Sequence, residues 1–339
     1  MREKLLLIRP INTSCYRHFR PGAIPTLKRH QYQVESGYTI TGEAPKQFLR
    51  VYEYESDGTC RKVNPCTWPL YIAKTARKWY PTESILEYAL NQVGECWGLH
   101  MAQSRLVWAG GQVRFLSRYF LSQKDSELVH GADILANYLN DHDRTLVAEI
   151  EQLGWERELA TVQLFNAALR SVFPTHHTEL LAGFVRMLLF DALVGNYDRH
   201  FYNYGIVRDL TGQRSPYFSP IYDTARGLFR NQPEARLVAL HGKKKQAAEF
   251  LQKYVRNSQA KIGWEGQRTL THFDLVRLLS ETETGLSRAE ISGFFRPNRL
   301  AESLQMLDVK FSDLLSPERL DFMKRCLQVR FTTILDLLC

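Results

Sequence analysis

Hydrophobic and polar positions divide the chain into a shorter part with strand-like patterns and a longer part with helical patterns. Alternating or short apolar runs at 47–54, 70–74 and 105–120 predict β-strands, and the pair Gly110-Gly111 within the last segment predicts a hairpin turn. From about residue 123 onward, apolar residues recur at helical spacing. The pattern predicts an α+β protein with two lobes, the first β-rich and the second mostly helical.

One helix is expected inside the β-rich lobe. It begins near Pro81 and runs to about Trp97, with Ile85, Ala89, Val93 and Cys96 on one side. The remaining helices are expected at 132–140, 145–153, 156–172 and 178–194, with several more from about 244 to Leu338. The chain contains neither an internal repeat nor a low-complexity linker.

Two charged residues stand out in the β-rich lobe. Lys74 ends the strand predicted at 70–74, and Glu87 lies off the apolar stripe of the following helix. A lysine held by a helix glutamate is the pair that orients the α- and β-phosphates in kinases. A lone lysine at the end of a strand is usually only solvated. Its significance therefore depends on the rest of the chain.

The segment that follows the apolar helix 178–194 carries the strongest chemical signal. Asp198 and Asn203 are five positions apart in it, and Asp223 follows in a strand-like setting. In phosphoryl transfer, one carboxylate accepts the proton of the attacking hydroxyl, while a carboxamide and a second carboxylate hold magnesium. The order of strand lysine, helix glutamate, hairpin, helix, catalytic loop and metal aspartate is that of kinases. A polar turn is the alternative for residues 195–203 taken alone.

Four segments resemble the signature of HipA-like serine/threonine kinases, bacterial enzymes best known as toxins of toxin–antitoxin pairs. Asp-x-His-x-x-Asn at 198–203 and Pro-x-Tyr-Asp at 220–223 match the catalytic loop and the metal segment. Residues 87–99 resemble the helix that begins with the paired glutamate and ends in Gly-Leu. Residues 39–46 resemble the family's Ser-Ile-x-Gly-x-x-x-Lys loop over the nucleotide phosphates. The resemblance implies a bilobal protein-kinase-like fold that uses ATP and Mg²⁺.

The resemblance also implies roles for individual residues. Asp198 is expected to act as the base, with His200 bracing its loop, and Lys74, held by Glu87, is expected to position the phosphates. Asn203 and Asp223 are the expected magnesium ligands. The expected nucleotide-binding residues are Thr39, Thr41, Gly42, Lys46, Lys74, Ser117 and Tyr119. Ser117 and Tyr119 lie at the crossing between the lobes, where adenine would bond to the backbone.

The chain departs from the family in two ways. Thr39 and Thr41 stand where relatives often have serines that become phosphorylated and eject the loop, so autophosphorylation here is an open question. Longer members carry an extra N-terminal subdomain ahead of the loop. We therefore expect an extension at 1–38, an N-lobe at 39–120 and a C-lobe at 121–339, and a small antitoxin or accessory protein encoded nearby as a partner. The resemblance suggests an aminoacyl-tRNA synthetase, or the kinase itself, as the substrate.

Composition agrees with a cytoplasmic enzyme, and the resemblance implies a bacterial one. The 339 residues carry 44 Lys and Arg against 36 Asp and Glu, a net charge of +8, and match no nucleic-acid-binding motif. Direct binding to nucleic acid or to a membrane is therefore not expected. Six cysteines share no CxxC spacing. Neither the leucine-rich start nor the run 180–194 is long and apolar enough for a signal peptide or a membrane span.

Two other functions remain open. A phosphatidylinositol-kinase-like lipid kinase also uses an Asp-Arg-His-x-x-Asn loop, although its metal aspartate normally sits in a different tripeptide. An inactive ATP-binding scaffold usually lacks at least one of the five residues that this chain retains together. Possible metal ligands at 141–143 and at 176–177 are explained more simply by loop polarity.

Overall fold

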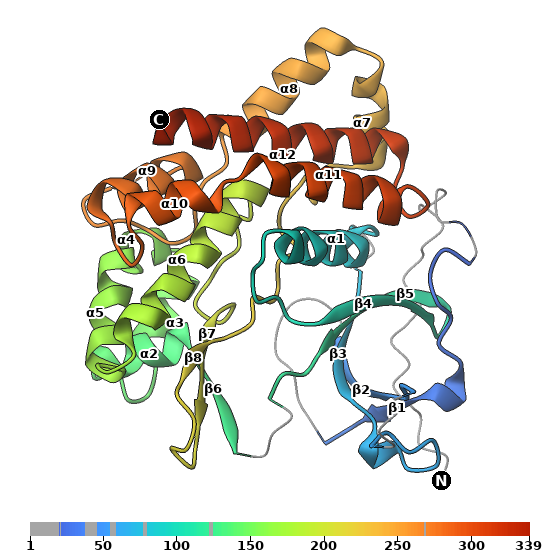
Figure 1. The fold of residues 1–339 in the computed structure, drawn as a ribbon, viewed down its shortest axis with the longest axis horizontal. Helices are drawn as coiled ribbons and strands as arrows, with labels where there is room; N and C mark the ends of the chain where they lie inside the picture. Colours follow the sequence, from blue (N-terminus) through green and yellow to red (C-terminus); the bar gives the residue numbers. More distant parts are fainter. Residues whose placement is uncertain are drawn as a thin grey trace.

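A computed structural model of the chain describes residues 20, 22–37, 46–54, 59–76, 80–121, 125–267 and 269–339. A five-stranded sheet with helix α1 above it stands beside a larger helical region (Figure 1). The predicted α+β class is confirmed. Among the described residues, every helix is too short or too polar to cross a bilayer.

The five-stranded sheet is antiparallel throughout, with the order β1-β2-β3-β5-β4. Its strands are β1 (Tyr32–Glu35), β2 (Lys46–Val51), β3 (Leu70–Thr75), β4 (Ser104–Ala109) and β5 (Gln112–Arg118). The turn between β4 and β5 is Gly110-Gly111, and both residues have positive φ, 60° and 77°, as glycine allows at no steric cost. Strand β1 comes from the segment that we expected to precede the lobe.

The two faces of this sheet are buried differently. Side chains alternate between the faces along each strand. One face packs a small cluster of its own around Leu49, Tyr71, Ala73 and Leu116. On the other face Leu106 and Phe115 join the main core together with helix α1 (Glu83–Cys96). Lys74 pairs in register with Phe115 and therefore lies on the face that α1 covers.

The larger region is built of helices and one small antiparallel sheet. Its helices are α2 (Gly131–Tyr138), α3 (Thr145–Gln152), α4 (Glu156–Leu159), α5 (Val162–Val172), α6 (His177–Val194), α7 (Glu234–His241), α8 (Lys244–Arg256), α9 (His272–Thr282), α10 (Arg288–Phe294), α11 (Pro297–Phe311) and α12 (Pro317–Leu338). The small sheet has the order β6-β7-β8, formed by β6 (Ser126–His130), β7 (Gly205–Asp209) and β8 (Tyr217–Phe218). Strands β7 and β8 follow the predicted catalytic loop.

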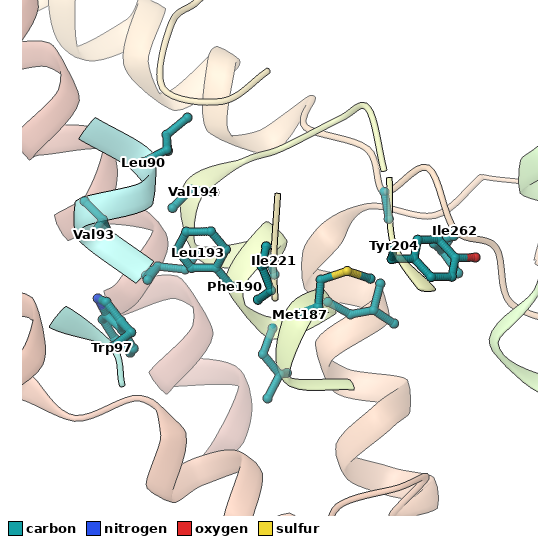
Figure 2. Packing of buried hydrophobic residues seen from close by; sticks show 14 of the residues in the cluster. Leu90, Val93, Trp97, Met187, Phe190, Leu193, Val194, Tyr204, Ile221 and Ile262 are labelled. Carbon is teal, nitrogen blue, oxygen red and sulfur yellow. The ribbon is translucent and has the colours of Figure 1, made fainter. Parts of the chain in front are cut away.

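One core joins the two regions. Figure 2 shows Leu90, Val93 and Trp97 from α1 and its C-cap beside Phe190, Leu193 and Val194 from α6. All six are at most 1% exposed. Helix α1, which carries Glu87, and helix α6, which leads into the predicted catalytic loop, are thus packed into the same hydrophobic cluster. This packing limits their relative movement.

The structure differs from the expected elements at two places. The helix expected at 156–172 is two helices, because the Thr161 side chain caps α5 by accepting from the Leu164 N–H and because Gly263 exchanges backbone hydrogen bonds with Ala160 and Val162. Residues 126–130, expected to be within helical sequence, form β6. Its partner β7 lies about eighty positions later, so short-range periodicity could not reveal it.

Candidate active site

Lys74 lies at the centre of a group of charges between the sheet and the catalytic loop. Its Nζ donates to Glu87 Oε1 at 2.5 Å and to Asp223 Oδ1 at 3.0 Å. Lys46 stands opposite Lys74 in the register of β2 and β3, so both side chains point to the same face, and Lys46 Nζ is 3.9 Å from Asp223 Oδ2. We call Lys46, Lys74, Glu87 and Asp223 the interlobe cluster.

The members of the interlobe cluster shift each other's pKa values. Burial alone would lower the pKa of Lys74, but Asp223 and Glu87 raise it above its ordinary value. Burial raises the pKa of Glu87 to about 7, although Lys74 opposes this. Burial would also raise the pKa of Asp223, but Lys74 and then Lys46 hold it well below its usual range. Lys74 and Asp223 are therefore charged near neutral pH.

Asp223 ends an extended segment that the backbone of the N-terminal region holds in place. Ile221 exchanges hydrogen bonds with His100 and Ala102, which supports the strand-like setting expected from the sequence. Asp223 itself has φ 54°, a left-handed conformation that Asp adopts more readily than most residues. Its side chain remains 31% exposed, so the carboxylate is accessible to solvent.

The predicted catalytic loop, residues 195–203, begins where α6 ends. Gly195 terminates the helix with φ 70°, and a Cβ at this position would lie 3.2 Å from an Arg330 nitrogen. Buried Arg199 then donates to both carboxylate oxygens of Asp191 at 2.8 Å, while Asn196 Nδ2 donates to Asp191 Oδ1 at 2.9 Å. We call Asp191, Asn196 and Arg199 the loop anchor.

Arg199 also connects the two segments that carry the expected magnesium ligands. Its third nitrogen donates to the backbone carbonyls of Asn203 and Tyr222, each at 2.9 Å. A single buried guanidinium therefore fixes the end of the catalytic loop and the residue before Asp223. Nothing in the spacing of the sequence indicated this role for Arg199.

Asn203 and Asp223 fit a magnesium site by their chemistry. Asn203 is 4% exposed and its Nδ2 donates to the Asp198 carbonyl at 2.8 Å, which orients the amide and leaves its oxygen for a ligand. Magnesium prefers oxygen ligands and commonly takes only one or two from protein side chains beside phosphates and water. In the described part of the chain, no three His, Cys, Asp or Glu side chains gather to form an alternative metal site.

Asp198, the expected base, lies 28% exposed at the surface of the loop. Its Oδ2 is 3.2 Å from Arg226 Nε, a contact that the sequence did not predict. His200 accepts a hydrogen bond from the Tyr202 N–H at its Nδ1 and donates its own N–H to the Asp198 carbonyl. Both hydrogen bonds join His200 to other residues of the same loop.

The remaining expected nucleotide contacts are only partly described. Thr39, Thr41 and Gly42 lie outside the described residues. At the crossing between the lobes, the Tyr119 N–H donates to the Leu70 carbonyl at 2.8 Å, and buried Ser117 lies within β5. The Arg118 N–H is likewise bonded, to the Gln103 carbonyl. Adenine would therefore have to use carbonyl groups here or displace these bonds.

A second buried ion pair that the sequence did not predict connects the site to α1. Arg230 donates from Nε and from a terminal nitrogen to Glu83 Oε1 at 2.9 and 2.6 Å, and both residues are at most 7% exposed. Its guanidinium also lies 3.9 Å from the centre of the Tyr80 ring. Glu83 is the first residue of α1, so the segment after Asp223 holds the helix that carries Glu87.

The residues set aside as metal ligands have local partners. His176 bonds to Thr175, and His177 bonds to Asn166 at 2.5 Å. Asp141 and Asp143 accept from backbone groups at the start of α3. Loop polarity and helix capping account for both segments, as expected.

Comparisons with known proteins agree with this geometry. A sequence model of the family described as HipA-like C-terminal domain matches residues 38–283. A search of curated proteins found no match. The structure is similar to that of the Helicobacter pylori proinflammatory kinase CtkA, with a TM-score of 0.68 and 15% identity over 93% of this chain and 97% of that one.

A more distant similarity joins the chain to HipA of Shewanella oneidensis, solved with HipB and operator DNA. The TM-score is 0.48 and the identity 13%, over 90% of this chain and 65% of that one. The similarity to CtkA shows that the fold is that of a known kinase structure.

Proposed function

Because the chain belongs to the family of HipA-like C-terminal domains, we propose that it is a protein kinase that transfers the γ-phosphoryl group of ATP to a serine or threonine hydroxyl. The observation that carries the proposal is Lys74, whose Nζ lies within hydrogen-bonding distance of both Glu87 and Asp223. That contact supports the proposal because kinases use a strand lysine held by a helix glutamate, together with a nearby carboxylate for the metal.

Each residue of the site has a role in the proposed reaction. Lys74, held by Glu87, and Lys46 bind phosphate oxygens, and Asn203 and Asp223 hold Mg²⁺. Asp198 accepts the proton of the substrate hydroxyl while the oxygen of that hydroxyl forms a bond to the γ-phosphorus. The bond from that phosphorus to the bridging oxygen breaks, and its electron pair leaves with ADP. Magnesium supplies charge neutralisation on the phosphates.

The decisive experiment compares two carboxylate variants. Asp198→Asn should retain binding of ATP with magnesium and lower phosphate transfer by about a hundredfold or more, the scale of lost general-base help. Asp223→Asn should instead lose magnesium-dependent ATP binding. Calorimetric titration and transfer from γ-labelled ATP to a dephosphorylated lysate measure the two effects. Asp308→Asn, an exposed carboxylate on α11, is the matched control and should behave as wild type.

Each alternative function has its own result in this experiment. Normal phosphate transfer by the Asp198→Asn variant would exclude Asp198 as the base. ATP binding by the wild type without any transfer would identify an inactive scaffold. Transfer to phosphatidylinositol vesicles but to no protein would identify a lipid kinase.

The toxin role and the partners are extensions of the proposal. We expect a small neighbour-encoded protein to bind at residues 1–60 and restrain toxicity, and an aminoacyl-tRNA synthetase to be a candidate substrate. Autophosphorylation of Thr39 or Thr41 remains part of the hypothesis. Expression of the chain alone should slow growth, and co-expression with the adjacent genes should restore it. Harmless expression of an active kinase would remove the toxin role and leave the kinase assignment intact.

A further inference from the structure

A pocket of about 420 Å³ is lined by two residues of the predicted catalytic loop and by residues from other parts of the chain. Gly195 and Tyr197 of the loop form one wall, and Asn231 and Gln232, from the segment after Asp223, form another. Residues of helices α7 and α8, which adjoin each other in Figure 1, line a further part of it. Tyr197 directly precedes Asp198, so the pocket adjoins the residue expected to receive the acceptor's proton.

The lining of this pocket is positively charged. Arg157, Arg236 and Lys253 contribute side chains, and none of the described residues that line the pocket is acidic. Arg236 lies 4.8 Å over the ring of Phe250, and both Arg236 and Lys253 are exposed, so their charges are available to a ligand. Like charges brought together in a concave site repel each other, and an anion relieves that repulsion.

A fourth cation lies directly behind the loop wall. Arg330 is fully buried, and its Nε donates to the Ala192 carbonyl at 2.7 Å. Within the described part of the chain, neither of its terminal nitrogens has a hydrogen-bond partner. One of them would be 3.2 Å from a Cβ built on Gly195, and the Ser258 hydroxyl, which lines the pocket, would be 3.4 Å from the same point. A buried guanidinium without a carboxylate adds to the positive potential at this wall.

We propose that this pocket binds an acidic side chain of the protein substrate and so helps to select the segment that is phosphorylated. The inference rests on the proposed function, because it assigns the pocket to the substrate of that reaction. The pocket has the volume for one or two side chains, and its charge suits a carboxylate or a phosphate already on the substrate. Arginine forks and aromatic walls are common in such recognition.

Peptide binding to the full-length chain tests the proposal. The probes are three fluorescein-labelled peptides with one acceptor serine, flanked by Glu, by Gln, or by Gln with a phosphoserine, and a short oligouridylate. At about 0.15 M salt, where distant surface charges are screened, we expect the Glu or the phosphoserine peptide to bind about tenfold or more tightly than the Gln peptide. The tighter of the two identifies the anionic group.

Two matched double variants assign the binding to the pocket. Arg236→Glu/Lys253→Glu should remove the preference for the anionic peptides. Lys243→Glu/Lys245→Glu makes the same change of charge at the start of α8, outside the pocket, and should change affinity less than twofold. Arg236→Gln/Lys253→Gln provides a milder version if the charge reversal prevents folding.

Three results would overturn the proposal. The first is equal affinity for all three peptides. The second is an equal loss of affinity for the anionic peptides in both Glu double variants. The third is oligouridylate binding that is tighter than peptide binding and is lost only in Arg236→Glu/Lys253→Glu. ATP titrations on the same proteins keep the two hypotheses apart. A wild-type chain that selects acidic peptides but binds no ATP would refute the kinase proposal and not the peptide site.

Discussion

The interlobe cluster and the loop anchor are both groups of charged or polar residues around an aspartate, but they differ in burial and in how tightly the aspartate is paired. In the loop anchor, Asp191 and Arg199 are at most 3% exposed and are joined by two bonds of equal length. In the interlobe cluster, Asp223 is 31% exposed and is shared between two lysines at 3.0 and 3.9 Å. In the first arrangement every guanidinium nitrogen already has a protein partner. In the second, the proposed metal ion and phosphates could replace the present partners of Asp223.

This contrast indicates a structural role for the loop anchor and a role in binding or chemistry for the interlobe cluster. A buried pair in which every guanidinium nitrogen donates to a protein oxygen holds backbone segments in place and offers little to a substrate. A partly exposed carboxylate with competing cations can change partners at little cost. The predictions below test whether the two groups of charges differ in this way.

The largest effect is expected from the loop anchor. Asp191→Ala leaves the buried Arg199 guanidinium without its carboxylate, so the free energy of unfolding should fall by about 3–5 kcal/mol. Urea denaturation followed by circular dichroism measures it. Asp308→Ala removes an exposed pair with Lys324 and should cost less than about 1 kcal/mol. Similar losses for the two variants would show that the loop anchor is not a scaffold.

Weakening the ion pair between Glu83 and Arg230 should have an intermediate effect. We expect it to reduce activity more than the stability of the fold. Glu83→Gln keeps the shape of the side chain but weakens the hold on α1, so Glu87 should position Lys74 less well. We expect a roughly tenfold loss of kcat/KM for ATP, the scale of coupling through a supporting contact. The exchange Glu83→Arg/Arg230→Glu should restore part of it. No rescue, or an unchanged kcat/KM in Glu83→Gln, would disconnect this pair from the interlobe cluster.

The smallest effect is a pH dependence at the edge of the loop anchor. His272 donates from Nε2 to the Asn196 carbonyl and accepts at Nδ1 from Ser258, and burial, reinforced by Arg330, lowers the pKa of His272 to about 3. Its ordinary pKa is about 6.5. Between these values the unfolded chain binds a proton that the folded chain does not. The contribution of neutral His272 to the free energy of unfolding is therefore fully present above pH 6.5 and is lost as the pH falls towards 3.

The expected loss from His272 is about 1 kcal/mol between pH 6 and pH 5. His272→Gln keeps an amide that can donate to the Asn196 carbonyl but does not titrate, so its unfolding free energy should depend less on pH over this interval. Denaturation at several pH values gives the comparison. An unchanged slope in the variant would assign the acid sensitivity to other groups.

The sequence predicted those parts of the site whose signals are local. The pairing of Lys74 with Glu87 followed from a strand end and the apolar stripe of the next helix. Asp198 and Asn203 followed from their spacing. The bond between Arg230 and Glu83 joins residues 147 positions apart, and no periodicity marks it. The same limit hid β6, whose partner β7 comes after α6.

Arg226 and Arg199 were missed for a different reason. Both are arginines in polar loops, where a charged side chain is usually only solvated. Their importance depends on the direction of a side chain within the folded loop, as Arg199 shows by bonding to the carbonyls of Asn203 and Tyr222. A lone Arg eight positions after an Asp carries no such information.

The backbone of Asp223 restricts how this protein can evolve. At φ 54° the position favours Gly, Asn and Asp over other amino acids. Aspartate codons become asparagine or glycine codons through a single nucleotide change, and neither product carries a carboxylate. The single-nucleotide changes that best suit this backbone therefore preserve the fold but remove the carboxylate that we propose as a magnesium ligand. Loss of the proposed catalysis should arise more readily in such a lineage than loss of the fold.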